Sequence, residues 1–598
     1  MSLTELAPDH LATEAFAGWL ERFGAGLEAH DVARIMECFA DESYWKDVLA
    51  FTWGYRTFHD AGEIAPAFER CLPRVRPRAV RIAAGRTPPR LVRRASREVV
   101  EAFFDFDTDI GRGTGFVRVQ PDRAALCQSK AWIVLTTLQD VRGFEEKVRD
   151  RRPTGVEYST NFAGDNWLDI RNRARSFEDR EPQVLIVGGG QAGLILGARL
   201  GQMGVDTLIV ERLPHVGDNW RNRYHSLTLH NEVWANSLPY LPFPDTWPTF
   251  VPKDKLAGWL EAYAEAMELN VWTGTEFVGG EYDAAGKVWT ARLRGADGTE
   301  RTMRPAHVVL AVGGVSGVPH VPALPGIETF GGEVMHSSQF SSGIPYAGRH
   351  AIVVGTGNSG HDVAQDLHSN GAAQVTMIQR SPTTVVSLVP SGTMVYAIYS
   401  EGPPPDDVDL ITASVPFEVL RDTYQWLTRK TSALDHDLLS GLDAVGFRTD
   451  SGPDDTGFHM RYLRQGGGYY INVGCAELIA DRKIGVVDAS AIDTFTPDGV
   501  LLRDGTTVPA EVVVLATGYE NLQEGIRRML GDEIADRVGP VWGFDENHIM
   551  KNMWQQTAQP HFWLMGGSLV DCRLYSKFLA VQIRADLAGL LPDRSVIG

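Results

Sequence analysis

The stretch VLIVGGGQAGLILGARL, residues 184–200, decides how the rest of this 598-residue chain is interpreted. Its first four residues are apolar and predict a short buried strand, and the apolar run after the glycines predicts a helix. Gly188, Gly190 and Gly193 stand between the two elements. Such glycines allow a tight turn and a close backbone approach, so that the helix N-terminus faces a pyrophosphate. The stretch therefore predicts a dinucleotide-binding α/β unit.

An acidic residue closes the next apolar strand, TLIVE. This residue is Glu211, which follows Gly190 by 21 positions. At that distance a carboxylate accepts a hydrogen bond from a free ribose 2′-hydroxyl. A free 2′-hydroxyl is a feature of FAD, so the first unit is predicted to bind FAD.

The glycine pattern occurs a second time, in AIVVGTGNSGHDVAQDL, at Gly355, Gly357 and Gly360. The strand that follows ends in Gln379 and Arg380, without an acid. Arginine suits a 2′-phosphate, which distinguishes NADPH. Two such units in one chain predict that a flavin and a nicotinamide meet between them.

Composition excludes several classes of protein. The chain is long enough for roughly three or four domains. A formal net charge of −19 without a Lys/Arg-rich run argues against a nucleic-acid partner. The N-terminal residues MSLTELAPDH do not resemble a signal peptide, and no apolar run reaches the roughly 18 residues of a membrane span. Five scattered cysteines, none in a C-x-x-C pair, indicate a cytoplasmic protein, and no metal site is expected.

The chain divides into five predicted segments. Residues 1–150 show helices followed by strands, which indicates an α+β domain. Residues 151–180 are rich in Arg, Asp, Pro and Gly and predict a linker. The expected order then continues with a first FAD-binding part (181–345), an NADPH-binding domain with an insertion (346–514, insertion 382–470) and a last FAD-binding part (515–598). The insertion has no motif, and we expect it to line the substrate pocket.

Five pieces of sequence occur in the order GGGQAG, FGGEVMHSSQF, GTGNSG, LATGY and YSKFLAVQI. In this order they resemble the flavin-containing monooxygenases, which are class B flavoprotein monooxygenases, and especially the YUCCA-like branch. The second piece fits the signature of that family at Phe330, Gly332, His336 and Phe340. The resemblance covers roughly residues 180–598. It implies an α/β fold with two Rossmann-like dinucleotide-binding domains, one for FAD and one for NADPH.

The resemblance also implies a reaction. NADPH would reduce the FAD, and the reduced flavin would take up O2 as a C4a-(hydro)peroxyflavin. One oxygen atom would then enter a small organic substrate, and the other would leave as water. In such enzymes the cofactor supplies the reactivity, while the protein positions it and excludes water.

The motifs and the resemblance together assign the cofactor-binding residues. The residues expected to bind FAD are Gly188, Gly190, Gln191, Ala192, Gly193, Glu211, Arg212, Asn219, Trp220 and Arg221. Those expected to bind NADPH are Gly355, Gly357, Asn358, Ser359, Gly360, Arg380 and Ser381. The LATGY piece adds Thr517, Gly518 and Tyr519 to the cofactor-binding set. A final helix beginning near Tyr575 would place Arg573, Tyr575 and Ser576 where its dipole favours negative charge on the reduced flavin.

Three residues are candidates for the chemistry itself. His230 aligns with the position beside the flavin where YUCCA-like members carry histidine, and Asn231 follows it. Either side chain could hydrogen-bond the reactive oxygen species, or His230 could be a core histidine with its bonds satisfied. His336 lies in the family signature. It has two alternative roles there: it orders the connection between the two domains, or it transfers a proton.

Residues 1–150 resemble the SnoaL-like, ketosteroid-isomerase-like fold, which is a cone-shaped α+β domain. The segment FADESYWKDVLAFTW, residues 39–53, carries this resemblance. The family sometimes holds a general base inside the cone, and the candidates here are His30, Asp47 and His59. In the alternative interpretation, aromatic residues fill the cone and the domain mediates packing or homodimerisation.

Several functions remain open or excluded. A disulfide reductase needs a thiol pair beside the flavin, and the absence of C-x-x-C excludes it. One alternative to a monooxygenase belongs to another class of function. In it the N-terminal domain binds a ligand or acts as an isomerase or dehydratase, and the flavoprotein region is a scaffold. Among oxygenations, Ser341 after Phe340 departs from the Baeyer–Villiger signature and favours heteroatom (N or S) oxygenation. Baeyer–Villiger oxidation of a ketone is the alternative.

Overall fold

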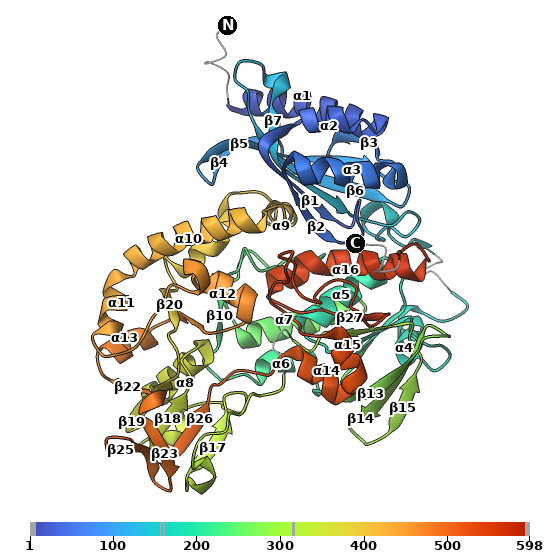
Figure 1. Ribbon diagram of the computed structural model, residues 1–598. Coiled ribbons are helices and arrows are strands. Elements are labelled where there is room, and N and C mark those ends of the chain that lie inside the picture. The colour runs from blue at the N-terminus through green and yellow to red at the C-terminus, as the bar shows by residue number, and fades with distance from the viewer. Residues whose placement is uncertain (1–7, 156–157, 159–161, 314–316, 593–598) are drawn as a thin grey trace.

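The computed structural model describes residues 8–155, 158, 162–313 and 317–592. The N-terminal domain lies at one end of the molecule, and the two nucleotide-binding units lie below it (Figure 1). Between them run the last helix of the chain and the helices of the predicted insertion, so the N-terminal domain contacts both (Figure 1).

The N-terminal domain is a seven-stranded sheet with three helices against it. Its strands follow the order β2-β1-β7-β6-β5-β3, and β4 pairs with β5. Only β1 and β7 run parallel; the other pairs are antiparallel. The elements are α1 (Pro8–Ala29), α2 (Val32–Glu37), β1 (Phe39–Val48), β2 (Tyr55–His59), α3 (Asp60–Val75), β3 (Arg78–Ile82), β4 (Arg90–Arg94), β5 (Arg97–Asp107), β6 (Arg112–Gln120) and β7 (Lys130–Leu138).

Aromatic side chains fill the interior between these helices and the sheet. Trp45 stacks on Phe68 with ring centroids 3.9 Å apart, and Trp19 stacks on Phe23 at 4.6 Å. Asp47 is fully buried, and its carboxylate accepts hydrogen bonds from the Thr136 hydroxyl and from the backbone and side chain of Thr52. This arrangement favours the packing interpretation of the domain over a general base inside it.

The other two base candidates of this domain lie at its surface. His30 follows α1 and is exposed. His59 ends β2 with its side chain about half exposed, and its ring stacks on Tyr44. Neither histidine faces the aromatic interior, so the structure does not bring the three candidates together.

The first nucleotide-binding unit is a five-stranded parallel sheet of order β12-β9-β8-β16-β27. Its last strand, β27, comes from residues near the C-terminus. The main elements are β8 (Val184–Val187), α5 (Gln191–Gln202), β9 (Thr207–Val210), α6 (Asp218–Arg221), α7 (Lys253–Ala266), β12 (Val271–Trp272), β16 (His307–Leu310) and β27 (Phe562–Leu564). Two smaller sheets accompany it, formed by β10 (Thr228–Glu232) with β11 (Phe250–Pro252) and by β13 (Thr275–Asp283), β14 (Val288–Gly295) and β15 (Glu300–Met303).

The second unit repeats this architecture in the order β17-β26-β18-β19-β22, with all strands parallel. Its elements are β17 (Glu333–His336), β18 (His350–Val354), α8 (Asn358–Ser369), β19 (Gln374–Gln379), α13 (Cys475–Ala480), β22 (Ile484–Asp488) and β26 (Val512–Leu515). A small sheet of β23 (Ile492–Thr496), β24 (Gly499–Leu502) and β25 (Thr507–Pro509) lies beside it. The predicted pair of Rossmann-like units is confirmed.

The insertion is mainly helical. It contains β20 (Thr384–Ser387), the 3₁₀ segment η7 (Gly392–Ser400), α9 (Pro405–Ala413), α10 (Phe417–Leu434), α11 (His436–Asp443), α12 (Gly457–Gln465) and β21 (Tyr469–Asn472). Strand β21 pairs with β20 in parallel. The helices α9 and α10 lie directly under the N-terminal domain (Figure 1). The linker between the first two domains holds α4 (Trp167–Ser176), and α14 (Leu522–Leu530) and α15 (Asp532–Val538) follow the second unit.

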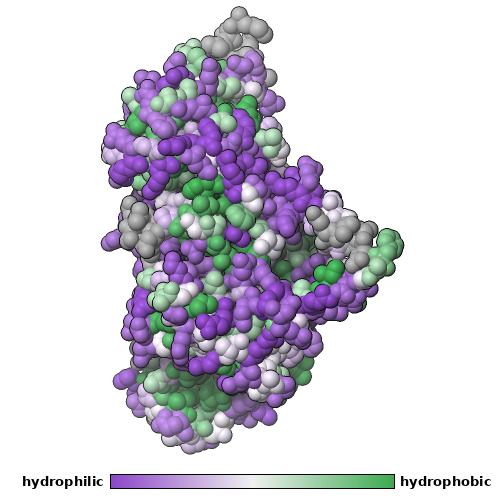
Figure 2. Space-filling model, turned by 90° about the vertical axis from the view of Figure 1, so that its right-hand side faces the viewer, coloured by the Kyte–Doolittle hydropathy of each residue, from purple (hydrophilic) through white to green (hydrophobic). Residues whose placement is uncertain are grey.

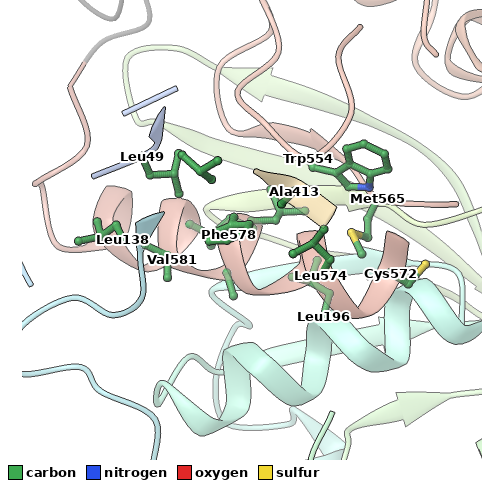
Figure 3. Packing of buried hydrophobic residues seen from close by; sticks show 14 of the residues in the cluster. Leu49, Leu138, Leu196, Ala413, Trp554, Met565, Cys572, Leu574, Phe578 and Val581 are labelled. Carbon is green, nitrogen blue, oxygen red and sulfur yellow. The ribbon is translucent and has the colours of Figure 1, made fainter. Parts of the chain in front are cut away.

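The last helix, α16 (Leu569–Leu587), joins the N-terminal domain to the first nucleotide-binding unit. Figure 3 shows Leu138 and Leu49 of the N-terminal domain on one side of α16, and Leu196 of α5 on the other. All these side chains belong to one continuous hydrophobic cluster. Burial of apolar surface stabilises by roughly 25 cal/mol per Å², so this shared core fixes the two domains against each other.

The expected start of this helix near Tyr575 is wrong, because α16 begins six residues earlier, at Leu569. The side chain of Ser568 accepts a hydrogen bond from the backbone N–H of Asp571, and the Asp571 carboxylate accepts one from the backbone N–H of Ser568. This reciprocal capping box satisfies two N–H groups that a helix start otherwise leaves without partners. It therefore sets the helix start at the serine.

Figure 2 shows one face as mostly hydrophilic, with scattered hydrophobic patches. Within the described part of the chain, none of the helices combines the length and the apolar character that a membrane span requires.

Candidate active site between two nucleotide cradles

The turn after β8 requires glycine at two positions. Gly188 has φ +112°, and a Cβ atom there would lie 2.5 Å from the backbone oxygen of Ala311. A Cβ atom on Gly193 would lie 2.0 Å from the backbone oxygen of Gly188. No side chain caps the N-terminus of α5, where Gly190 is the N-cap residue. The free N–H groups of this helix end suit a pyrophosphate, so the turn fits the group that the sequence predicts.

Glu211 lies directly over this turn. Its carboxylate accepts hydrogen bonds from the backbone N–H of Gly189 at 2.7 Å and from that of Leu213 at 2.9 Å. The side chain is mostly buried, yet an ionised carboxylate has room for about four hydrogen bonds, so acceptor capacity remains for a ribose hydroxyl. The tertiary structure thus places Glu211 within reach of the glycine turn after β8 and the N-terminus of α5. We call this turn and helix end the first cradle.

The other predicted FAD residues divide into two groups. A Cβ atom on Gly190 would lie 3.1 Å from the Asn219 amide nitrogen, and the Trp220 indole donates to the Gln191 side chain at 3.2 Å. Ala192 is buried in the first turn of α5, so these residues surround the cradle.

Two arginines form the second group. Arg221 forms ion pairs with Asp218 and Glu261, and Arg212 is exposed.

The turn after β18 repeats the same geometry. Gly355 has φ +111°, and a Cβ atom there would lie 2.4 Å from the backbone oxygen of Ala516. A Cβ atom on Gly360 would lie 2.2 Å from the backbone oxygen of Gly355. Gly357 is the N-cap of α8, again without a side-chain cap, and the nearest atom to a Cβ atom there is the Tyr469 oxygen at 3.8 Å. The turn after β18 and the N-terminus of α8, which we call the second cradle, therefore also have room for a phosphate.

Strand β21 of the insertion borders this second cradle. The side-chain oxygen of Asn358 accepts a hydrogen bond from the backbone N–H of Ile471 at 2.9 Å, so Asn358 holds the insertion in place. Ser359 is half-buried in the first turn of α8. Of the two polar residues predicted in this turn, Asn358 already has a partner within the protein.

Arg380 and Ser381 lie at the end of β19 with exposed side chains. Arg448 of the insertion donates to the backbone oxygen of Arg380 at 2.9 Å and forms an ion pair with Asp488 at 2.8 Å. Arg380, which is predicted to bind the 2′-phosphate, therefore has a second arginine beside it, Arg448. Arg448 lies 68 residues away in sequence, so no local signal indicated it.

His336 ends β17 and contacts the LATGY turn. Its Nε2 hydrogen-bonds the backbone oxygen of Gly518 at 2.9 Å, and its Nδ1 accepts from the backbone N–H of Ser338 at 3.1 Å. Burial lowers the pKa of His336. Tyr519 stands edge-on to the imidazole, and the Thr517 hydroxyl donates to the backbone oxygen of His320. These contacts tie the connection between the two units together.

His230 and Asn231 lie on β10, between the two units and the insertion. Burial lowers the pKa of His230, and the carboxylate of Asp362 on α8 acts in the opposite direction. The same carboxylate accepts a hydrogen bond from the Tyr224 hydroxyl. The Asn231 side chain hydrogen-bonds the Tyr396 hydroxyl of the insertion. His230 therefore lies close to α8, and Asn231 connects β10 to the insertion.

Arg573, Tyr575 and Ser576 lie in the second turn of α16 rather than in its first. The guanidinium of Arg573 is 2 % exposed and binds the Asp409 carboxylate at 2.7 and 2.8 Å. The Ser576 hydroxyl is buried and donates to the backbone of Arg573. Tyr575 stacks on Trp554 at 3.9 Å, with its ring beside a cavity. Of the three residues, only Tyr575 lines this cavity.

This cavity is a chamber of about 960 Å³ under the N-terminal domain. Its walls come from β1, β2 and α3, from the insertion, and from residues 544–578. The lining is rich in aromatic side chains, including Tyr44, Tyr55, Tyr396, Tyr424, Trp554 and Tyr575. Residues of the insertion line this chamber together with residues of the N-terminal domain, and no sequence pattern indicated the contribution of the N-terminal domain.

The first turns of α16 contribute to the lining of the chamber. Ser568 and Asp571 both line it. Burial raises the pKa of Asp571, although the carboxylate accepts hydrogen bonds from the Ser568 hydroxyl and from the Tyr462 hydroxyl. The S-x-x-D spacing in the sequence was a signal for this helix start.

A cluster of His307, His561 and Asp586 lies beside the first sheet and is the one group of potential metal ligands among the described residues. Both histidine Nε2 atoms lie 3.3 Å from the Asp586 carboxylate. The Trp563 indole donates to Nδ1 of His307, so a neutral His307 carries its proton on Nε2. A metal would need a lone pair at that atom, so a protonated Nε2 facing the Asp586 carboxylate fits this cluster better than a metal does.

Comparison with known proteins places these features in a family. A sequence model of the family Flavin-binding monooxygenase-like matches residues 182–398. The chain is 32 % identical over 342 residues to rice "Indole-3-pyruvate monooxygenase YUCCA1", which covers 57 % of this chain and 77 % of that protein. It is 30 % identical over 358 residues to rice "Indole-3-pyruvate monooxygenase YUCCA4", covering 57 % and 74 %.

The fold is also similar to that of solved flavoprotein structures. A steroid monooxygenase bound to NADP superimposes with a TM-score of 0.51 at 18 % identity, covering 68 % of this chain and 85 % of that one. The prediction of an FAD-containing, NADPH-dependent monooxygenase is confirmed at the level of the family. The chain belongs to the Flavin-binding monooxygenase-like family.

Proposed function

We propose that the chain is an NADPH- and O2-dependent monooxygenase that oxygenates a small organic substrate in the chamber at the start of α16. The observation that carries the proposal is the pair of uncapped glycine cradles, one with Glu211 and one with Arg380. An acid favours a ribose with a free 2′-hydroxyl, and an arginine favours a ribose with a 2′-phosphate. The two cradles would therefore hold different nucleotides.

Residue roles follow from these contacts. The α5 N-terminus would hold the FAD pyrophosphate, with Glu211 on the ribose and Asn219 beside the turn. The α8 N-terminus would hold NADPH, and Arg380 with Arg448 would receive the 2′-phosphate. When bound, the flavin supplies the redox chemistry and activates oxygen.

The residues around the expected flavin ring would orient it and exclude water. His230 is held neutral by burial at neutral pH, so its imidazole can donate one hydrogen bond and accept another. Asn231 is anchored through Tyr396, which also lines the chamber. We assign positioning of the reacting oxygen to this pair. His336 would order the interdomain connection rather than transfer a proton, because both ring nitrogens have partners.

Heteroatom oxygenation is the reaction favoured by Ser341 after Phe340. A second candidate is oxygenation at a carbonyl carbon, since the curated relatives are named for indole-3-pyruvate, a 2-oxo acid. The interior of the N-terminal domain is packed with aromatic side chains, which argues against that domain as a separate enzyme. Homodimerisation through it remains a proposal.

Anaerobic reduction tests the proposed function. NADPH added to the FAD-loaded protein is expected to bleach the flavin absorbance near 450 nm, and readmission of air is expected to restore it. A panel of amines, sulfides, ketones and 2-oxo acids then distinguishes the two reactions by oxygenated product formed per NADPH consumed. Failure of NADPH to bleach the flavin would overturn the proposal.

A further inference from the structure

Strand β1 turns alternate side chains to opposite faces of the N-terminal sheet. Trp45 and Asp47 point into the aromatic core of the domain. Tyr44, Lys46 and Val48 lie on the other face, and all three line the chamber. The outer face of this sheet is therefore a wall of the cavity, and α10 of the insertion packs against it through Val419.

This wall is firmly attached. The Tyr55 hydroxyl donates to the backbone oxygen of Trp554 at 3.2 Å. Arg86 binds the Asp407 carboxylate at 2.7 Å, where the Asp407 side chain is only 3 % exposed. Arg94 and Arg90 both bind Glu401. These contacts, together with the shared core around α16, make the N-terminal domain part of the chamber rather than a tethered appendage.

Lys46 is the charged side chain of β1 in this wall. Its ammonium group donates to the backbone oxygen of Val415 at 3.2 Å. Among the described residues no carboxylate oxygen lies within 4.0 Å of it. Burial lowers the pKa of Lys46 to about 8, while the charge of Glu418 acts in the opposite direction. An ammonium has three N–H donors, so Lys46 retains donors for an anionic group in the chamber.

Aromatic rings line the chamber together with Lys46. Tyr575 stacks on Trp554 with an interplanar angle of 6°, and Tyr55 stands edge-on to Tyr575. Tyr396 and Tyr424 line the side that the insertion contributes. Flat aromatic groups pack well against such walls, and aromatic pairs contribute beyond their buried area.

We propose that the N-terminal domain is a specificity-determining wall of the substrate chamber, in which Lys46 binds the carboxylate of an aromatic acid. The inference rests on the proposed function in one respect: the end of the substrate that lies at α16 is taken as the end that is oxygenated. Binding at Lys46 itself does not depend on oxygen transfer. A substrate held in this way would span the chamber, with its charged group at the N-terminal domain and its body among the aromatic rings.

Calorimetry on the full-length, FAD-loaded oxidised protein tests this proposal with naphthalene-2-acetate and naphthalene-2-acetamide as probes. These two molecules have nearly the same shape and differ in charge. We expect the acid to bind about tenfold more tightly than the amide, because hydrogen bonds to charged groups are stronger than neutral ones. Lys46→Gln is expected to remove this preference while leaving the affinity for the amide within about twofold.

Two further variants complete the design. Lys46→Arg keeps the charge and is expected to keep most of the preference for the acid. Lys130→Gln changes an exposed lysine at the start of β7 and is expected to leave both affinities unchanged. Equal affinities for the acid and the amide in the unmodified protein, or a preference that survives Lys46→Gln, would overturn the proposal. The comparison in the unmodified protein needs no variant and no turnover, so its outcome is separate from the flavin-bleaching test.

Discussion

The imidazole of His336 donates through Nε2 to the backbone oxygen of Gly518 at 2.9 Å. Ser338 donates its backbone N–H to the other ring nitrogen, which fixes the tautomer. The hydrogen bond to Gly518 joins β17, the strand that carries the family signature, to the turn after β26. We infer that this residue of the signature acts by holding two segments of the connection together.

His336→Ala is expected to reduce the free energy of unfolding by about 1–3 kcal/mol, because it removes two buried hydrogen bonds. It is also expected to slow flavin reduction by NADPH, since the connection between the two units loosens. The pH dependence of that reduction is expected to keep its shape. Stopped-flow reduction at several pH values measures this, and loss of one limb of the pH profile would instead assign proton transfer to His336.

Glu211→Gln is expected to weaken FAD retention by roughly 10- to 100-fold, because charge-assisted hydrogen bonds contribute about 1.5–3 kcal/mol. The carboxylate also accepts from the backbone N–H groups of Gly189 and Leu213, so the cradle itself should loosen. Glu276→Gln on the exposed part of β13 serves as the matched control. Equilibrium dialysis of the flavin gives the dissociation constants, and unchanged FAD affinity in Glu211→Gln would contradict the assignment.

Arg380→Gln is expected to raise the KM for NADPH by about tenfold or more and to leave the KM for NADH within about twofold, because only NADPH carries the 2′-phosphate. Arg448→Gln is expected to have a smaller effect in the same direction, since Arg448 supports the Arg380 backbone. Arg528→Gln, on the exposed side of α14, is the control. An equal change in both KM values would show that Arg380 does not read the phosphate.

Glu101 of the N-terminal domain gives a prediction about acid stability. Burial by itself raises the pKa of this carboxyl, but Arg118, Arg94 and Arg90 lower the pKa to about 2, from an ordinary value of 4.5. A carboxyl with a depressed folded-state pKa stabilises the fold above its unfolded pKa and loses this contribution as the pH falls toward its folded pKa. We therefore expect a loss of roughly 3 kcal/mol between pH 4.5 and pH 2.

Glu101→Gln removes that pH-dependent contribution and leaves three arginines around a neutral side chain. Breaking a buried pair in this way is expected to destabilise the domain by about 3–5 kcal/mol at pH 7. Chemical denaturation at pH 7 and pH 3 measures both effects. If the variant and the unmodified protein lost equal stability on acidification, the low pKa of Glu101 would not be the cause.

The sequence by itself determined the two nucleotide cradles and the kind of nucleotide expected in each. Such cradles are local features: strand, glycine turn and helix follow one another within about 17 residues, and the positive φ at Gly188 and Gly355 can be anticipated from their place in the pattern. Glu211 and Arg380 follow directly at the ends of the next strands. For this reason the fold of residues 181–598 and the family could be predicted without coordinates.

Only the tertiary structure decided which residues surround the chamber. The chamber walls come from residues 44–74, 395–463 and 544–578, which no sequence spacing relates. Lys46 could be recognised as a chamber residue only after β1 showed which of its faces was packed against α3. Arg573 was predicted near the flavin, yet Asp409 of the insertion binds its guanidinium in the core. Side-chain environments of this kind depend on packing between distant segments, and no local pattern in the chain encodes them.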